Sequence, residues 1–179
     1  MSYIFESENL MFRKFEKKDG KALYKYHRQP QLMKWIPNES YEDLDETLEA
    51  IEFYSDCVNK NKLPFVLAIE LKENGKMIGD TGINEVDGKV GELEVGYSIC
   101  EEYMGNGYAT EAVRAITEFV KEHFNMKIVY GRVMSGNIAS VRVMEKCGYK
   151  YIETEFDAED DPYGKGMLVY KYDLENNCI

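Results

Sequence analysis

The chain has 179 residues, of which 44% are hydrophobic and 31% charged, and this is the size and composition of one globular domain with one core. Its 33 acidic residues outnumber its 22 basic ones, and the formal net charge of −11 argues against nucleic acid or an anionic membrane as a partner. No basic and apolar leader opens the chain, and no stretch is long and apolar enough to cross a membrane, so we expect a cytoplasmic protein.

Cysteine and histidine positions argue against metal and redox chemistry. The four cysteines are far apart, so no CxxC pair exists to bind zinc or exchange electrons; they are Cys57, Cys100, Cys147 and Cys178. The two histidines, His27 and His123, have no second histidine or cysteine at metal-ligand spacing. We therefore expect reduced thiols, no bound metal, and no enzyme built on zinc or on a histidine triad.

The first third of the chain predicts one strand and two helices. Residues 10–15 alternate apolar and polar side chains as a strand does, and residues 22–26 can form a short helix before Pro30. A second helix begins at Ser40–Asp43, which resembles a capping box, and its apolar side chains repeat on one face. This helix is expected to end between Asn61 and Pro64.

The middle of the chain predicts an antiparallel meander of three strands. Residues 65–69 have the composition of a buried strand, and Asn74-Gly75 is a strong two-residue turn into a second strand at residues 77–83. Asp87-Gly88 is another turn, and it leads to a third strand at residues 93–99.

The remaining residues alternate helices with strands. The hydrophobic period changes to about 3.6 in a helix from residue 109 to about 125, followed by a strand at residues 128–133. A short helix over residues 138–146 ends where Gly148 can take the left-handed cap, and two strands follow, at residues 149–156 and 167–174. The acidic segment 157–164 between them is a loop. The order β-α-α-β-β-β-α-β-α-β-β predicts a mixed α/β domain.

The segment Tyr97–Ala112 passes from a strand through a glycine-rich turn directly into a helix. Gly105 and Gly107 let backbone N–H groups converge on a phosphate, and the helix dipole adds favourable charge there. Alone, this pattern fits a plain tight turn equally well. It is not a Walker loop, because Tyr108 follows Gly107 where lysine is needed, and it is not a Rossmann fingerprint, because it follows an antiparallel meander.

The loop resembles the acetyl-coenzyme A loop of the GCN5-related N-acetyltransferase (GNAT) superfamily, Gln/Arg-x-x-Gly-x-Gly/Ala, which falls on Met104–Ala109. A second signature falls on Asn137–Ser140 and continues through Glu145–Tyr149. Leu10–Phe15 and Gly79–Ile83 look like the branch that contains the ribosomal-protein N-terminal acetyltransferases. The resemblance covers nearly the whole chain. It implies one domain over residues 1–179 with the GNAT fold, a largely antiparallel mixed sheet of about six or seven strands flanked by about four helices.

The resemblance also implies where acetyl-coenzyme A binds. The pantetheine arm pairs with backbone groups where the strand ending at Tyr97, Ser98 and Ile99 splays from its neighbour. The pyrophosphate is bound by backbone amides of Gly105, Asn106, Gly107, Tyr108, Ala109 and Thr110. Asn137 contacts the cofactor, caps the helix that begins after it, or does both.

At two positions the sequence departs from the family pattern, so the identities of the catalytic acid and base are not determined by the resemblance. Met144 stands where related enzymes have a tyrosine that protonates the leaving thiolate. Ser140 matches the serine that some members of the ribosomal-protein branch use for that task, so the resemblance makes it the candidate proton donor, against a plain first-turn residue. Arg132 stands where some relatives have a glutamate base. Glu94, and after it Glu85, are the candidate bases, although each also fits a plain surface carboxylate.

The resemblance implies an enzyme that transfers the acetyl group of acetyl-coenzyme A directly to a primary amine in a ternary complex, without a metal. The acceptor is open between a protein N-terminus and a small polycation such as a polyamine or an aminoglycoside, for which the acidic charge gives weak support. A non-catalytic acyl-coenzyme A sensor or scaffold is a third hypothesis, and a homodimer stays open.

Overall fold

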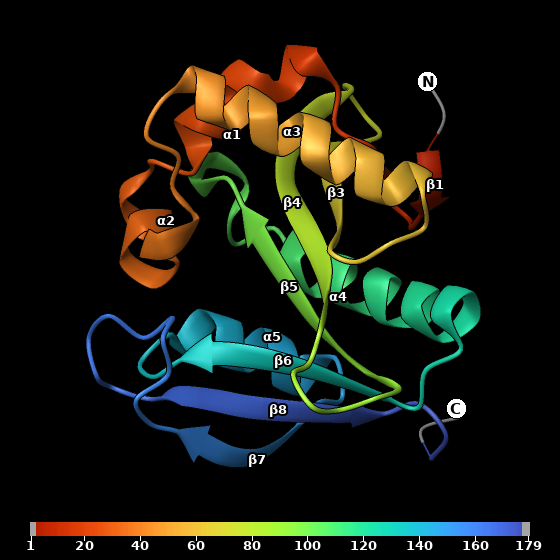
Figure 1. Cartoon of the computed structure of the whole chain (residues 1–179), viewed down its shortest axis with the longest axis vertical. Helices are drawn as coiled ribbons and strands as arrows, with labels where there is room; N and C mark the ends of the chain where they lie inside the picture. Colours follow the sequence, from red (N-terminus) through yellow and green to blue (C-terminus); the bar gives the residue numbers. More distant parts are fainter. Residues whose placement is uncertain (1–2, 177–179) are drawn as a thin grey trace.

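An eight-stranded sheet runs through the computed structural model, which describes residues 3–176 (Figure 1). Its strands follow in the order β1-β2-β3-β4-β5-β6-β8-β7, and each neighbouring pair is antiparallel except the parallel pair of β5 and β6. The strands are β1 (Tyr3–Glu6), β2 (Leu10–Arg13), β3 (Phe65–Leu71), β4 (Lys76–Glu85), β5 (Glu92–Ile99), β6 (Ile128–Met134), β7 (Lys150–Glu155) and β8 (Met167–Asp173).

Helices cover both faces of this sheet. Figure 1 shows α1 and α3 in front of the strands, with α4 and α5 behind them. The helices are α1 (Gly20–Tyr26), α2 (Pro30–Trp35), α3 (Leu44–Asn59), α4 (Tyr108–Phe119) and α5 (Ile138–Lys146), with shorter turns η1 (Lys17–Asp19), η2 (Pro37–Glu39), η3 (Glu101–Tyr103) and η4 (Val120–Phe124). Within residues 3–176, no helix is long and apolar enough to cross a membrane.

Two hydrophobic clusters hold the layers together. The larger one packs the apolar face of α4, with Val113 and Ile116, against β5 residues such as Val95 and Ile99. The smaller one lies under α1, α2 and α3 and includes Phe15, Leu23, Leu32, Ile51 and Ala68. Burial of these side chains fixes β5 between the two helical layers, and β5 leads directly into the glycine-rich loop.

The parallel pair β5 and β6 stays together only at its beginning. Glu92, Leu93 and Glu94 pair with Ile128, Val129 and Tyr130, and no later residue of β5 has a partner on β6. From there β6 follows β8 as far as Met134, whereas β5 follows β4 as far as Ile99, and the two strands diverge in Figure 1. The last residues of β5 therefore have one backbone edge that β6 does not occupy.

The expected fold class is confirmed, but the described residues form eight strands and five α-helices where about six or seven strands and about four helices were expected. β1 pairs with β2, and the ring of Phe5 stacks between those of Phe12 and Phe119 with centroid distances of 4.3 Å to each. One of the two rings that stack on Phe5 is more than a hundred positions away in α4, and that contact cannot be predicted from the sequence near β1.

Some helix boundaries differ from the expected ones because the residue that marks a helix end can also mark a helix start, or because a neighbouring residue is the cap. Pro30 was expected to follow a helix, but it stands at the first turn of α2, a position where its missing N–H costs nothing. The N-cap of α3 is Asp43, whose carboxylate accepts from the amide of Glu46, so α3 begins later than Ser40. The helix expected to reach about residue 125 ends as α4 at Phe119 and continues as the wider turn η4, closed by Asn125 in the left-handed conformation.

Candidate active site

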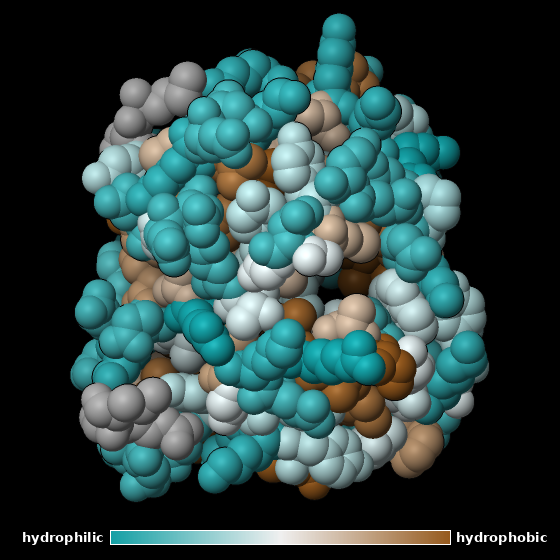
Figure 2. All heavy atoms as spheres, turned by 180° about the vertical axis from the view of Figure 1, so that it is seen from behind, coloured by the Kyte–Doolittle hydropathy of each residue, from teal (hydrophilic) through white to brown (hydrophobic). Residues whose placement is uncertain are grey.

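A cleft of about 410 Å³ opens where β5 and β6 diverge. It is bordered by α2, the end of β5, the loop before α4 and one face of α5. Figure 2 shows the molecule from behind, and this face is hollowed near its middle, with hydrophobic residues at the margin. Most of the residues that the sequence singled out line the cleft: Tyr97, Ser98, Ile99, Gly105, Gly107, Tyr108, Ala109, Thr110, Asn137 and Ser140.

Two glycines shape the loop between β5 and α4. Gly105 and Gly107 have φ angles of +78° and +87°, in the left-handed region that glycine adopts most readily. Gly107 is the N-cap residue of α4, and its position carries no side-chain cap. A Cβ at either glycine would have nothing within 4 Å, so backbone conformation rather than crowding requires glycine. The first-turn amides and the positive end of the α4 dipole thus border a space that an anion can enter.

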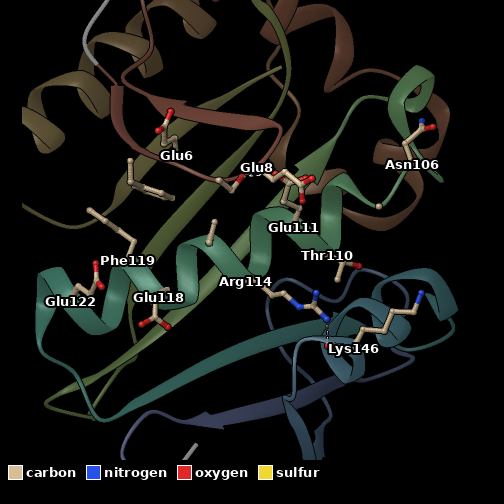
Figure 3. Close-up of a pocket in the computed structure, with 14 residues that line it drawn as sticks. Glu6, Glu8, Asn106, Thr110, Glu111, Arg114, Glu118, Phe119, Glu122 and Lys146 are labelled. Carbon is tan, nitrogen blue, oxygen red and sulfur yellow. Dashed lines mark hydrogen bonds between the residues drawn. The ribbon is translucent and has the colours of Figure 1, made fainter. Parts of the chain in front are cut away.

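Asn106 does not line this cleft. Its Nδ2 donates to the carbonyl oxygens of Tyr103 and Met104 at 3.1 and 3.2 Å, which holds the loop in shape. It borders a wider depression of about 820 Å³ along α4 (Figure 3). Carboxylates are prominent around this depression, namely those of Glu6, Glu8, Glu111, Glu118 and Glu122. They disfavour phosphate there, and a direct cofactor contact of Asn106 stays a prediction.

Two cations of the cleft were missed in the sequence. Arg142 and Lys146 lie four residues apart on α5, and both line the cleft. Arg114 of α4 reaches the same corner, where its Nη2 donates to the carbonyl oxygen of Lys146 at 2.9 Å (Figure 3). A sequence signal for this pair existed, because residues at i and i+4 share one helix face and the sequence already predicts a cofactor contact for Asn137, just before this helix.

Two hydroxyl groups meet at the inner end of the cleft. The Tyr97 hydroxyl donates to Ser140 Oγ at 3.1 Å. Burial raises the pKa of Tyr97 to about 12, although the bond to Ser140 acts in the opposite direction, so the phenol is protonated at neutral pH. The Ser140 amide donates to Asn137 Oδ1 at 3.3 Å, so Asn137 is the N-cap of α5, one of the two readings left open. Tyr97 had been expected to contribute only its backbone.

A second cavity of about 350 Å³ lies over β4 and β5, and Tyr97 lines both spaces. A buried polar cluster at this cavity centres on Asp80, which accepts from Ser98 Oγ at 2.8 Å and from the hydroxyl of Tyr26. His27 Nε2 lies 2.7 Å from the same carboxylate. Burial alone would raise the pKa of Asp80, but His27 and these hydrogen bonds hold it below its ordinary value. The Ser98 side chain is therefore engaged by Asp80.

Glu94 lines neither of the two spaces. Burial raises its pKa, the neighbouring Arg132 opposes that shift, and the carboxylates of Asp160 and Glu155 add to it. Arg132 itself is held by Asp160 at 2.8 and 2.9 Å and by Glu155 at 2.7 Å. Glu85 is an exposed residue at the end of β4. The role of base stays a prediction for Glu94 and Glu85.

Comparison with known proteins identifies the family. Residues 9–150 match the acetyltransferase (GNAT) domain. The chain belongs to the GNAT family. It is 25% identical over 166 residues to the uncharacterized N-acetyltransferase p20 of Bacillus licheniformis, covering 93% of this chain and 91% of that protein. This GNAT member is thus an N-acetyltransferase, as the sequence predicted.

Solved structures carry the same fold. The ribosomal-protein-S5-alanine acetyltransferase of Vibrio fischeri superposes with a TM-score of 0.82 at 18% identity, over 96% of this chain and 97% of that one. The spermidine N-acetyltransferase of Vibrio cholerae, solved with coenzyme A and spermine, gives 0.79 at 19% identity, over 94% and 98%. At these identities the likeness shows the GNAT fold alone, and it leaves the branch and the acceptor open.

Three of the four cysteines lie in the part of the chain that the structure describes. Cys57, Cys100 and Cys147 are free thiols, and Cys178 lies outside the described residues. Burial raises the pKa of Cys100 to about 12, which leaves it a poor nucleophile at neutral pH. Among residues 3–176, no group of three or more His, Cys, Asp or Glu side chains could hold a metal ion.

Proposed function

We propose that the chain transfers the acetyl group of acetyl-coenzyme A to a primary amine within a ternary complex. The observation that carries this proposal is the cleft where β5 leaves β6, with an unpaired strand edge on one side and an uncapped helix N-terminus on the other. An extended amide-bearing arm fits the first and a pyrophosphate fits the second. The protein is expected to act in the cytoplasm as one domain, without a metal ion; a homodimer stays open.

The cofactor would lie along the residues that border this cleft. The backbone of Tyr97, Ser98 and Ile99 would pair with the pantetheine arm, and the amides from Gly105 to Thr110 would bind the pyrophosphate. Arg142 and Lys146 add positive charge at the edge of the cleft, in a chain whose net charge of −11 otherwise repels a polyphosphate.

The chemistry needs two proton transfers. An ammonium group must first lose a proton, because its ordinary pKa is about 8 for an α-amine and above about 10 for an alkylamine. The neutral nitrogen then attacks the thioester carbonyl, a C–N bond forms and the C–S bond breaks. The second proton that the nitrogen must lose passes through a hydroxyl group to the coenzyme A thiolate. Ser140, which accepts a hydrogen bond from Tyr97, is the proposed donor of that proton.

A panel of acceptors tests this function. The chain would be mixed with acetyl-coenzyme A and with spermidine, an aminoglycoside, or a short peptide with a free N-terminus, while released thiol is measured. Thiol release with any of these amines supports the enzyme. Binding of acetyl-coenzyme A by calorimetry, without release for any amine, favours the non-catalytic sensor, and absence of binding contradicts both.

Replacing Ser140 with alanine is expected to lower turnover by about tenfold to a hundredfold, or about 1.4 to 2.7 kcal/mol of barrier, with little change in acetyl-coenzyme A affinity. The effect is modest because a thiol with an ordinary pKa of about 8.5 is already a fair leaving group. Ser55→Ala is the control, since Ser55 bonds to the carbonyl of Phe15 away from the cleft. Parent turnover in Ser140→Ala contradicts the role, and weaker cofactor binding at parent turnover reassigns Ser140 to the cofactor site.

A further inference from the structure

The cleft of about 410 Å³ is lined by hydroxyl groups and two cations, but by no carboxylate. Among the described residues that border it, none is an aspartate, a glutamate, a histidine or a cysteine. The cations, Arg142 and Lys146, lie at its edge, where the proposed complex uses their charge. Hydroxyl groups are therefore the side chains through which a proton can pass at the inner end of the cleft.

The backbone of β5 indicates where the sulfur of the cofactor would lie. β6 pairs with β5 as far as Glu94, which faces Tyr130, so the free edge of β5 begins after Glu94 and ends at Ile99. In the proposed complex the pyrophosphate binds beyond Ile99, at the N-terminus of α4. An arm that starts there and runs back along the free edge reaches its far end near Tyr97, before β6 closes the edge. The sulfur would then lie at the inner end of the cleft, where the hydroxyl groups of Tyr97 and Ser140 meet.

The phenol of Tyr97 acts as a donor in this pair. Its hydroxyl donates to Ser140 Oγ at 3.1 Å, and its ring packs against the larger hydrophobic cluster, which holds the hydroxyl in place. Because burial raises the pKa of Tyr97 to about 12, the phenol keeps its proton at neutral pH. A serine hydroxyl has one proton and two lone pairs, and Tyr97 occupies one of the lone pairs. The proton of Ser140 is left for another acceptor.

The Ser140 hydroxyl faces the cleft from the first turn of α5. Ser140 is half-buried and lines the cleft, and its amide donates to Asn137 Oδ1 at 3.3 Å, which fixes the turn. Within residues 3–176, its hydroxyl proton has no acceptor on a side chain or on the backbone. A serine in a helix often donates to the carbonyl one turn earlier, and here that bond is not made. The proton can therefore point at a ligand atom in the cleft.

The next residue on this face of α5 gives no proton. Met144 follows Ser140 by one turn and is 2% exposed. A Cβ built on Gly131 of β6 would lie 2.8 Å from Met144 Sδ, so the thioether packs against the sheet and not into the cleft. A thioether also has no proton to donate. A phenol that takes part in proton transfer here must therefore come from another element, and Tyr97 of β5 is in contact with Ser140.

We propose, on the basis of the acetyl transfer proposed above, that Tyr97 is the positioning residue of a hydroxyl shuttle: its phenol holds Ser140 Oγ so that the Ser140 proton points at the coenzyme A sulfur. After the neutral amine has added to the thioester carbon, nitrogen and sulfur are bonded to the same carbon, so one hydroxyl can bridge both. As the C–S bond breaks, the thiolate takes the Ser140 proton and Ser140 Oγ takes the second proton of the nitrogen. Tyr97 keeps its own proton, and its hydrogen bond stabilises the negative charge that develops on Ser140 Oγ. The products are the amide and the coenzyme A thiol, and both side chains end as they began.

Replacing Tyr97 with phenylalanine removes one oxygen and leaves the ring and the β5 backbone in place. The single-turnover rate should fall by about tenfold, at unchanged acetyl-coenzyme A affinity, with whichever of spermidine, the aminoglycoside or the peptide releases thiol. Because Tyr97 acts through Ser140, the double variant with Ser140→Ala should be no slower than Ser140→Ala alone. Tyr149→Phe is the matched control, since Tyr149 is 3% exposed, bonds to Thr117 Oγ1 at 2.7 Å and does not line the cleft. Parent rate in Tyr97→Phe, or a further tenfold loss in the double variant, contradicts the shuttle.

The pKa of the thiol of bound coenzyme A tests the hydroxyl pair without turnover. A free thiol has an ordinary pKa of about 8.5, and a hydroxyl that donates to the sulfur favours the thiolate and lowers this value. The ultraviolet absorbance of the thiolate is followed during a pH titration of the complex, with desulfo-coenzyme A, which lacks the sulfur, as the background. Ser140→Ala should raise the pKa of the bound thiol by about one unit, Tyr97→Phe should raise it by less, and Tyr149→Phe should leave it unchanged.

The two measurements separate the shuttle from the proposed function. A bound thiol whose pKa responds to Tyr97→Phe, in a chain that acetylates no amine, keeps the hydroxyl pair at the sulfur and removes the proposed enzyme. A thiol pKa that neither Tyr97→Phe nor Ser140→Ala moves overturns the shuttle, even where the chain acetylates an amine.

Discussion

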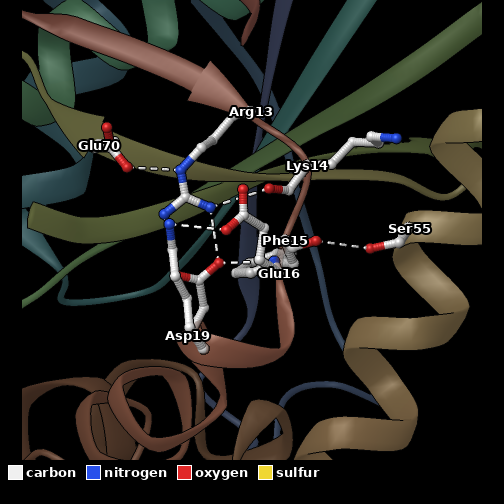
Figure 4. A network of polar contacts seen from close by, with 8 residues as sticks. Arg13, Lys14, Phe15, Glu16, Asp19, Ser55 and Glu70 are labelled. Carbon is white, nitrogen blue, oxygen red and sulfur yellow. Dashed lines mark hydrogen bonds and ion pairs between the residues drawn. The ribbon is translucent and has the colours of Figure 1, made fainter. Parts of the chain in front are cut away.

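Replacing Arg13 with methionine is expected to lower the free energy of unfolding by about 3–5 kcal/mol, because it removes the one cation between two buried carboxylates. Arg13 is 3% exposed, and its Nε donates to Glu70 at 2.6 Å while Nη1 and Nη2 donate to Asp19 at 2.7 and 3.0 Å (Figure 4). The network joins β2, β3 and the turn η1, and Asp19 also accepts from the Glu16 amide at 2.8 Å. Methionine leaves both carboxylates buried without their partner.

Urea unfolding followed by circular dichroism measures this loss. Lys127→Met is the matched control, since Lys127 pairs with Glu175 through side chains that are 72% and 61% exposed, and such a pair contributes little. A loss in Arg13→Met no larger than that of the control would mean that water or a rearranged side chain satisfies the two carboxylates. In that case the contacts of Arg13 in Figure 4 would not stabilise the packing of the first strands against the turn η1.

Elements fixed by local chemistry were predicted well from the sequence. The bounds of α5, residues 138–146, match the prediction because Asn137 caps its start and Gly148, with φ of +85°, follows its end. The meander of β3, β4 and β5 was found for the same reason, since alternating side chains and the Asn74-Gly75 turn are local signals. β1 was missed because it is only four residues long and because one of the two rings that stack on Phe5, that of Phe119, lies in a distant helix.

In the candidate site, too, the parts with local sequence signals were predicted and the parts formed by distant residues were not. The cleft where β5 and β6 diverge could be predicted from the sequence because most of its residues fall in two short segments, Tyr97–Thr110 and Asn137–Lys146, where strand end, glycine and helix start follow one another. His27 was set aside because no ligand or nucleophile stands near it in the sequence, whereas its partner Asp80 is 53 positions away. Only the fold places the two at one cavity.

Replacing Gly107 with valine is expected to weaken acetyl-coenzyme A binding by about a hundredfold or more. The φ of +87° is strained for a residue with a Cβ, and more so for a β-branched one, so the loop must move to relieve it. That movement shifts the first-turn amides of α4, and a valine side chain would occupy the open space in front of them. Titration calorimetry with acetyl-coenzyme A measures the loss.

Gly88→Val separates loss of the anion site from simple strain. Gly88 has a φ of +72°, and a Cβ there would also meet nothing within 4 Å, but it lies in the turn between β4 and β5, at the opposite end of β5 from the glycine-rich loop. Both variants should therefore lose a similar amount of stability, about 1–2 kcal/mol for a left-handed residue with a side chain. Only Gly107→Val should lose the cofactor. Parent affinity in a folded Gly107→Val protein would mean that the pyrophosphate does not bind at the N-terminus of α4, and the cleft would need another ligand.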